Sequence, residues 1–158
     1  MHYSPQNKGW NIEQILEHIS IANYFLLILI KKGTIKALNN SLNKDFSIDL
    51  IDYDLDWIKL KAIGEHNSFH WNRPEHMEPK GKMNLLELKK HLKEQMDECM
   101  QCLIQLKNGE GVLYKTTMSV NGLGKIDVYH YIYFLVQHAQ RHISQMKKVA
   151  AEFNSKRQ

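Results

Sequence analysis

Apolar residues recur every three or four positions in four long segments of this chain. That spacing places them on one face of an α-helix, because an α-helix turns once every 3.6 residues. The segments cover residues 12–32, 47–70, 85–108 and 128–153. No segment alternates apolar and polar residues between clear turn signals, so no sheet strand is expected. The pattern predicts an all-α four-helix bundle.

Three of these helices begin with a recognisable cap. Asn11 and Gln14 have the three-residue spacing of a capping box, and Asn84 and Glu87 repeat it. Asp127 is expected to cap the last helix, because a short acidic side chain can accept hydrogen bonds from the free N–H groups of the first turn.

Glycine and proline mark the expected ends of the first two helices. Gly33 is expected to end the first helix, as glycine often does just past a helix terminus. The second helix is expected to start at Ser47 and to end near His70, before Pro74. Its inward-facing residues would be Ile51, Leu55, Ile58 and Ala62. The connections between the helices are long, so spacing alone leaves the topology open.

Length and composition fit one domain, residues 1–158, that can bury roughly 70% of its unfolded surface. The N-terminus lacks a signal-peptide pattern, and the longest apolar run, Tyr24 to Ile30, is far shorter than the ~20 residues that span a bilayer. We therefore expect a cytoplasmic protein without a membrane partner. The net charge is +4, but lysine and arginine are spread over the chain without a basic and aromatic patch, so no nucleic-acid partner is expected.

The two cysteines, Cys99 and Cys102, are separated by two residues in the middle of the third helical segment. A redox-active pair with that spacing usually lies at a helix N-terminus, where the thiol pKa is lowered. Two ordinary reduced thiols are therefore the preferred interpretation.

Two histidines four residues apart, His138 and His142, lie on the apolar face of the last helix. Both imidazoles should point inward, and a buried polar group without a partner costs about 1–3 kcal/mol. A metal ion is one possible partner, and hydrogen bonds within the core are the alternative.

A third ligand could come from the first helix, where His18 lies beside Ile15, Ile19 and Ala22 at the edge of the apolar stripe. Three inward histidines from two helices of one bundle indicate a metal site more strongly than any pair. The second pair, His66 and His70, has the same spacing but lies in a polar stretch and is not expected to bind metal. His130 lies two helical turns, about 12 Å, before His138, too far to share an ion with it.

The same residues carry a resemblance to a known family. The segment 10–19, with Trp10 before His18, resembles the first helix of the DinB-like superfamily, and residues 124–145, with His138 and His142, resemble its last helix. Residues 73–79 resemble the loop before its third helix. The resemblance implies a DinB-type four-helix bundle in up-down-down-up order, often a homodimer, with a divalent metal on His18, His138 and His142. Characterised relatives include S-transferases that use low-molecular-weight thiols such as bacillithiol or mycothiol.

A metal on three neutral imidazoles would keep its full +2 charge and would favour the anion of a bound water or thiol. Zinc and nickel are the preferred ions, although imidazole ligands also suit copper and iron. A zincin-type protease is not expected, because Ala139 follows the first histidine where a zincin has its glutamate base. Glu17 should point about 100° away from His18, so no catalytic base is assigned. Arg141 and Gln145 could orient ligands or bind substrate, and a solvated Arg141 is the alternative, so neither is assigned a role.

Three functions remain open at this point. A transferase that uses a low-molecular-weight thiol and acts on a small-molecule substrate is preferred. The alternatives are a metal-dependent hydrolase and a non-catalytic metal-binding or ligand-binding bundle.

Overall fold

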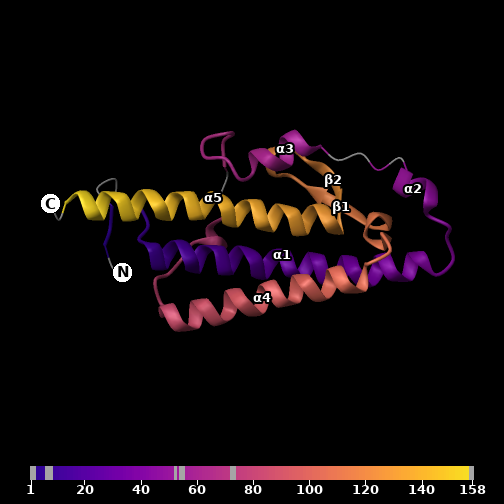
Figure 1. Cartoon of the computed structure of the whole chain (residues 1–158), viewed down its shortest axis with the longest axis horizontal. Coiled ribbons are helices and arrows are strands. Elements are labelled where there is room, and N and C mark those ends of the chain that lie inside the picture. Colours follow the sequence, from indigo (N-terminus) through magenta and orange to yellow (C-terminus); the bar gives the residue numbers. More distant parts are fainter. Residues whose placement is uncertain (1–2, 6–8, 52, 54–55, 72–73, 157–158) are drawn as a thin grey trace.

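The computed structural model describes residues 3–5, 9–51, 53, 56–71 and 74–156 (Figure 1). Within these residues, the long elements are three helices: α1 (Ile12–Ser41), α4 (Leu85–Gln105) and α5 (Val128–Ser155). α1 packs against both α4 and α5, and Figure 1 shows it between them. The shorter elements are α2 (Ser47–Ile51), α3 (Trp57–Ala62), and the strands β1 (Lys115–Met118) and β2 (Gly124–Asp127). Three 3-10 turns complete them: Glu75–Met77, Glu110–Leu113 and Val120–Gly122.

The expected helix starts are confirmed. Asn11 and Asn84 each form a complete capping box with the residue three positions later, Gln14 and Glu87. The Asp127 carboxylate accepts a hydrogen bond from the His130 backbone N–H at 3.0 Å. Each cap satisfies N–H groups that have no partner inside the helix, which fixes where the helix begins.

The expected end of the first helix at Gly33 is wrong, because α1 continues to Ser41. A Cβ atom at Gly33 would lie 2.9 Å from Val128 Cγ2 and 3.4 Å from a ring carbon of Tyr114. The glycine therefore lets α1 approach the start of α5 closely, and the helix accommodates it at a cost of about 1 kcal/mol relative to alanine.

The contacts of α1 fix the directions of the other two helices. His18 meets His142 in the second half of α5, and Gly33 meets Val128 at its start, so α1 and α5 are antiparallel. Along α4, Gln95 donates to the Ser20 carbonyl, and Glu98 pairs with Lys31 further on, so α1 and α4 are parallel. The expected up-down-down-up order is not confirmed. Loop lengths leave helix direction open, and the side-chain contacts along each interface select it.

The second long helix does not form as expected, because two short helices take its place. The Asp56 side chain accepts a hydrogen bond from the Lys59 N–H at 3.0 Å and starts α3 as a new helix. A side chain that binds its own backbone competes with a continuous helix. Ile51 and Ile58 are 81% and 85% exposed rather than buried, and Leu55 lies outside the described residues.

The expectation of no strands is also wrong. β1 and β2 pair antiparallel, with Thr116 opposite Ile126. The strands have only four residues each, which is too short for clear alternation of apolar and polar residues. Asn121 and Gly122 in the turn between them, and Gly124 at the start of β2, have positive φ, a conformation that glycine and asparagine tolerate best. The hairpin leads directly into the N-terminus of α5.

The main core lies where α1, α4 and α5 meet, and α3 adds Leu60 to it. Its fully buried members include Ile30, Leu106 and Leu135. A smaller cluster of Ile15, Ile19 and Val149 lies at the end of α1 that carries His18. By length and hydropathy, α1 is the one described helix that could cross a membrane. Half of its most apolar window is buried inside the structure, as in the core helix of a globular bundle.

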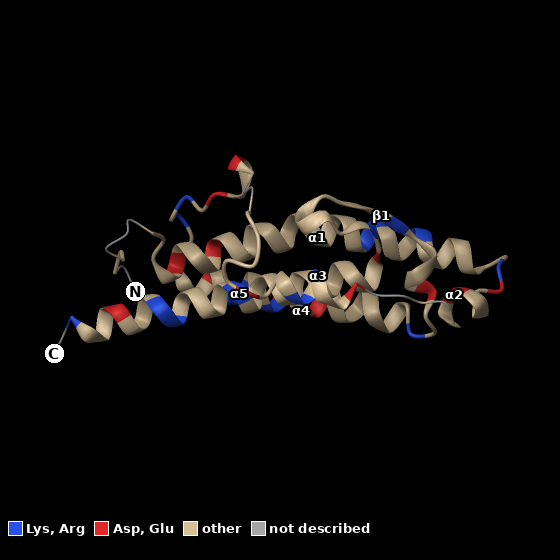
Figure 2. Cartoon of the chain, turned by 90° about the horizontal axis from the view of Figure 1, so that it is seen from above, with Lys and Arg blue, Asp and Glu red and all other residues tan. Residues whose placement is uncertain are grey.

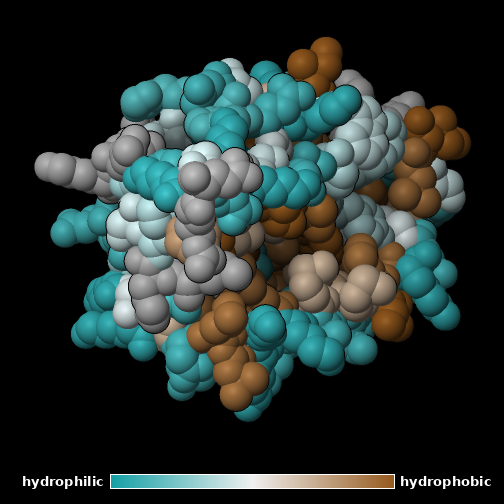
Figure 3. Space-filling model, turned by 60° about the vertical axis from the view of Figure 1, so that its left-hand side comes forward, coloured by the Kyte–Doolittle hydropathy of each residue, from teal (hydrophilic) through white to brown (hydrophobic). Residues whose placement is uncertain are grey.

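Charged residues of both signs are distributed along the length of the molecule (Figure 2). The surface also exposes apolar side chains, and Figure 3 shows apolar areas between hydrophilic ones. Exposed apolar residues occur on α1 and on α4, among them Tyr24, Ile28, Met96, Met100 and Ile104.

Candidate metal centre

The structure brings together the three histidines that the sequence singled out. His18 comes from α1, and His138 and His142 come from adjacent turns of α5. One ring nitrogen from each lies within 4.8 Å of the others, and the three residues are only 5–8% exposed. The Nε2 atoms of His138 and His142 are 3.1 Å apart. Antiparallel packing of α1 on α5 creates this cluster, because it places the first turns of α1 beside the middle of α5.

Hydrogen bonds on the outer nitrogens orient two of the rings. His18 Nδ1 lies 2.7 Å from the Met77 carbonyl oxygen, and His142 Nδ1 lies 2.9 Å from Gln145 Oε1. Both oxygens accept, so each Nδ1 carries the hydrogen and each Nε2 keeps a lone pair. His138 Nδ1 is buried and has no hydrogen-bond partner among the described residues. An outer acceptor on Nδ1 is the arrangement that orients metal-bound histidines in proteins.

Lone pairs that converge in a buried place repel one another unless a cation or a proton lies between them. The Nε2 atoms of His138 and His142 are at hydrogen-bonding distance, so one proton between them removes this repulsion when no ion is bound. The pKa of His138 is held well below its ordinary value, chiefly by burial and then by the nearby His142, His18 and Arg141. Protonation of His138 is therefore disfavoured, and neutral imidazole is the form that ligates metals. The donor set is thus compatible with a divalent metal ion.

Aromatic rings surround the cluster. The Trp10 ring lies 4.8 Å from the His18 ring, and the Trp71 and Phe134 rings lie 5.8 Å and 6.4 Å from the His138 ring, measured between centroids. The Arg141 guanidinium lies over the Trp71 ring, with its central carbon 4.9 Å from the centroid. These apolar neighbours lower the local dielectric, which strengthens electrostatic interactions inside the site.

The segment before α4 is fastened to α1 beside the cluster. Met77 supplies the carbonyl that holds His18, and the Gly81 N–H donates to Glu17 Oε2 at 2.6 Å. Glu17 is buried, and its carboxylate is not a member of the group formed by the three histidines. Its carboxylate holds the backbone of this segment, so it is not placed to act as a base at the cluster.

The other described histidines are not members of the cluster. His66, His70, His76 and His91 are exposed. His130 is buried, with Nδ1 2.7 Å from Asp127 Oδ1. In the described part of the chain, no other group of histidine, cysteine or acidic residues has a geometry that could hold a metal ion.

The two cysteines are free thiols, buried on the face of α4 that packs into the core. Burial, followed by the proximity of Cys102 and Glu98, raises the pKa of the Cys99 thiol to about 11. A protonated, buried thiol is unreactive, which agrees with the interpretation as ordinary reduced cysteines.

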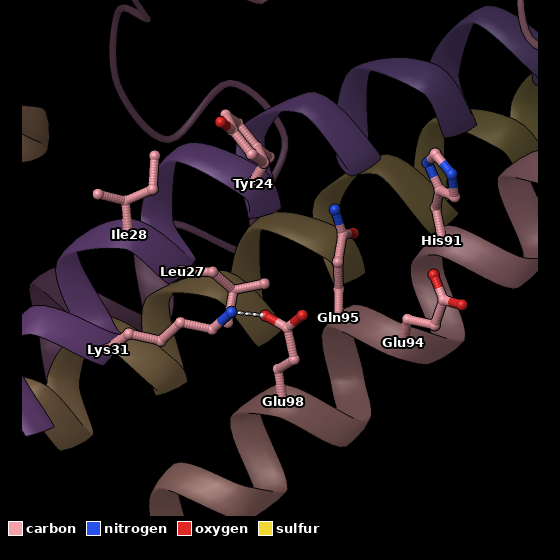
Figure 4. Close-up of a pocket in the computed structure, with 8 residues that line it drawn as sticks. All are labelled: Tyr24, Leu27, Ile28, Lys31, His91, Glu94, Gln95 and Glu98. Carbon is pink, nitrogen blue, oxygen red and sulfur yellow. Dashed lines mark ion pairs between the residues drawn. The ribbon is translucent and has the colours of Figure 1, made fainter.

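Two surface pockets lie on another side of α1. One, of about 230 Å³, is lined by α1 and α4 and contains the ion pair Lys31–Glu98 at 2.5 Å (Figure 4). The other, of about 410 Å³, shares Tyr24, His91 and Gln95 with it. Neither pocket is lined by a histidine of the cluster. Because hydrogen bonds orient two of its rings, the cluster is the stronger candidate for a functional site.

The sequence identified the three histidines but assigned none of the residues that support them. Gln145 is three residues after His142, a helical spacing that could have identified it as a partner. The Met77 carbonyl is a backbone group, and any residue type could supply it. Trp71 reaches His138 from a segment whose position only the fold determines.

The sequence model of one family, described as the DinB superfamily, matches residues 1–146 of the chain. The match covers most of the 158 residues and includes all three clustered histidines. No curated protein and no solved structure has a significant match to the chain.

Proposed function

The chain belongs to the DinB superfamily, and we propose that it is a metal-dependent enzyme whose divalent ion is held by His18, His138 and His142. The observation that carries the proposal is the convergence of the three buried imidazoles, with the outer nitrogens of His18 and His142 on oxygen acceptors. Three protein ligands leave a tetrahedral ion one position for a small molecule. Zinc and nickel are the proposed ions, since imidazole ligands suit both.

The proposed reaction is transfer to or from a low-molecular-weight thiol with a small-molecule substrate. When bound, a divalent ion on three neutral ligands would lower the pKa of a thiol or a water that binds it. The described residues of the cluster include no carboxylate beside the three histidines. A thiol that ionises on a metal needs no separate base, whereas many metal-dependent hydrolases use a carboxylate to activate water. This difference favours the transferase over the hydrolase.

The chain's own residues have four tasks in this proposal. His18, His138 and His142 bind the ion, and Gln145 and the Met77 carbonyl orient two of the rings. Trp10 and Trp71 limit the access of water to the site. The N-terminal turns of α1 and the middle of α5 hold these groups on rigid helices, which keeps the ligand geometry fixed.

Metal analysis of untagged protein tests the site. We expect about one divalent ion per chain, with His138→Ala and His142→Ala abolishing binding. The double variant His66→Ala/His70→Ala removes an exposed pair with the same spacing and is the matched control. Full metal content in the α5 variants would contradict the proposal.

Turnover of a chromogenic electrophile tests the reaction. A rate that requires both metal and an added small thiol supports the transferase. Turnover of an ester or amide without thiol would support the hydrolase instead, and tight metal binding with neither activity would support a non-catalytic bundle.

The assembly and the location are part of the proposal. A homodimer would cover some of the apolar side chains exposed on α4, such as Met96, Met100 and Ile104. A cytoplasmic location agrees with the free thiols of Cys99 and Cys102. Light scattering coupled to size-exclusion chromatography measures the oligomeric state directly.

A further inference from the structure

The Trp71 indole lies close to both the histidine cluster and the guanidinium of Arg141. One indole ring lies 5.8 Å from the His138 ring and 4.9 Å from the central guanidinium carbon of Arg141. Arg141 also lies between His138 and His142 in the sequence of α5. The guanidinium is therefore held at the edge of the cluster and is itself only partly exposed.

The known partners of this guanidinium are neutral. Arg141 Nη1 donates to the Glu65 backbone carbonyl, and the indole face of Trp71 lies beneath the cation. Among the described residues, no carboxylate forms an ion pair with Arg141. A guanidinium has five N–H donors in a planar fork that matches the two oxygens of a carboxylate. Its positive charge would add to that of a divalent ion on three neutral ligands, so the site favours anionic molecules.

We propose that Arg141 binds the carboxylate of a small anionic thiol whose sulfur binds the metal ion. The inference rests on the proposed function and adds the substrate class: a thiol that carries a carboxylate rather than a neutral thiol. The Trp71 ring lies against the guanidinium at the edge of the site, and the Glu65 carbonyl accepts a hydrogen bond from it. A carboxylate that approaches the free side of the fork would form a charge-assisted, bidentate hydrogen bond.

Thiol binding to the cobalt-loaded protein tests the inference, because sulfur ligation changes the visible absorption of Co²⁺. The probes are 3-mercaptopropionate, which carries a carboxylate, and 2-mercaptoethanol, which does not. The measured quantity is the ratio of the two Kd values in each protein. Comparing this ratio between variants cancels the intrinsic difference between the thiols. We expect Arg141→Gln to reduce the preference for the charged thiol about tenfold or more, and Arg141→Lys to keep part of it.

Lys147→Gln is the matched control, since it removes one positive charge from an exposed position of the same helix. It should leave the ratio unchanged. High salt should weaken the preference of the wild-type protein only slightly if the carboxylate binds at a partly buried guanidinium. Circular dichroism and cobalt content verify that the Arg141 variants are folded and loaded.

A purely structural role for Arg141 gives a different result. If the side chain only holds the segment near Glu65 against α5, both thiols bind more weakly to Arg141→Gln by the same factor. The ratio of the two Kd values then stays at the wild-type value, which overturns the inference. The proposed function is then still supported by cobalt binding that depends on the three histidines. Cobalt binding that does not depend on them overturns both.

Discussion

The chain contains two histidine pairs with the same four-residue spacing, and the fold buries one pair and exposes the other. His138 and His142 lie on the buried face of α5, where His18 of α1 joins them. His66 and His70 follow the end of α3 and are exposed. Spacing alone therefore does not bring histidines into a cluster that could hold a metal ion. The buried pair differs in two respects. A third imidazole reaches it from α1, and the His142 ring has an oxygen acceptor in Gln145 of α5 itself.

The largest expected effect is the loss of metal binding when a histidine of the buried pair, but not of the exposed pair, is replaced. His142→Ala should abolish metal binding, because only His18 and His138 remain as ligands. His66→Ala/His70→Ala should bind as the wild-type protein does. Metal content by atomic emission measures both, and equal content in the two variants would contradict the comparison.

Metal removal should lower the melting temperature. An ion that binds only the folded state adds RT ln(1 + [L]/Kd), which is about 2.7 kcal/mol at a concentration 100 times the Kd. For a domain of this size the shift is roughly 5–10 °C. The His66→Ala/His70→Ala variant should show the same shift with chelator as the wild-type protein, measured by calorimetry. An unchanged melting curve after verified metal removal would argue against the site.

Substitution of Gln145 tests whether the orientation of the His142 ring strengthens metal binding by the buried pair. Its Oε1 accepts from His142 Nδ1 at 2.9 Å, so Gln145→Leu should weaken metal binding by about 10- to 100-fold. Gln140→Leu, on an exposed position of the same helix, is the control. Competition with a chelator of known affinity measures both constants. If the two variants bind equally well, Gln145 does not orient the ligand.

The smallest effect on the site is expected from modification of the buried cysteines. They are buried like the clustered histidines, but a buried thiol that stays protonated is unreactive. With a pKa of about 11 for Cys99, only about 0.1% of this thiol is ionised at pH 8. The thiolate fraction and the labelling rate should rise about tenfold per pH unit up to that pKa. Alkylation of native protein at pH 8 should be slow and should leave metal content unchanged. Fast labelling of the folded protein would contradict the raised pKa.

Part of the fold could be read from the sequence because it depends on local interactions. The capping boxes at Asn11 and Asn84 and the cap at Asp127 involve residues within one helical turn, and all three are confirmed. Features that depend on distant contacts were missed. Gly33 appears as a helix end in the sequence, but it is a close-packing position opposite Val128. Asp56 starts a new helix where apolar spacing suggested a continuous one.

The sequence by itself determined the helical periodicity, the helix starts and the three histidines, since side chains at spacings of three and four share a face whatever the surroundings. Only the tertiary structure decided which histidines meet. The antiparallel packing of α1 on α5 places His18 beside His138 and His142, and it brings the Met77 carbonyl and the Trp71 ring to the cluster. The position of a neighbouring segment is set by packing over the whole core, and no local pattern carries that information.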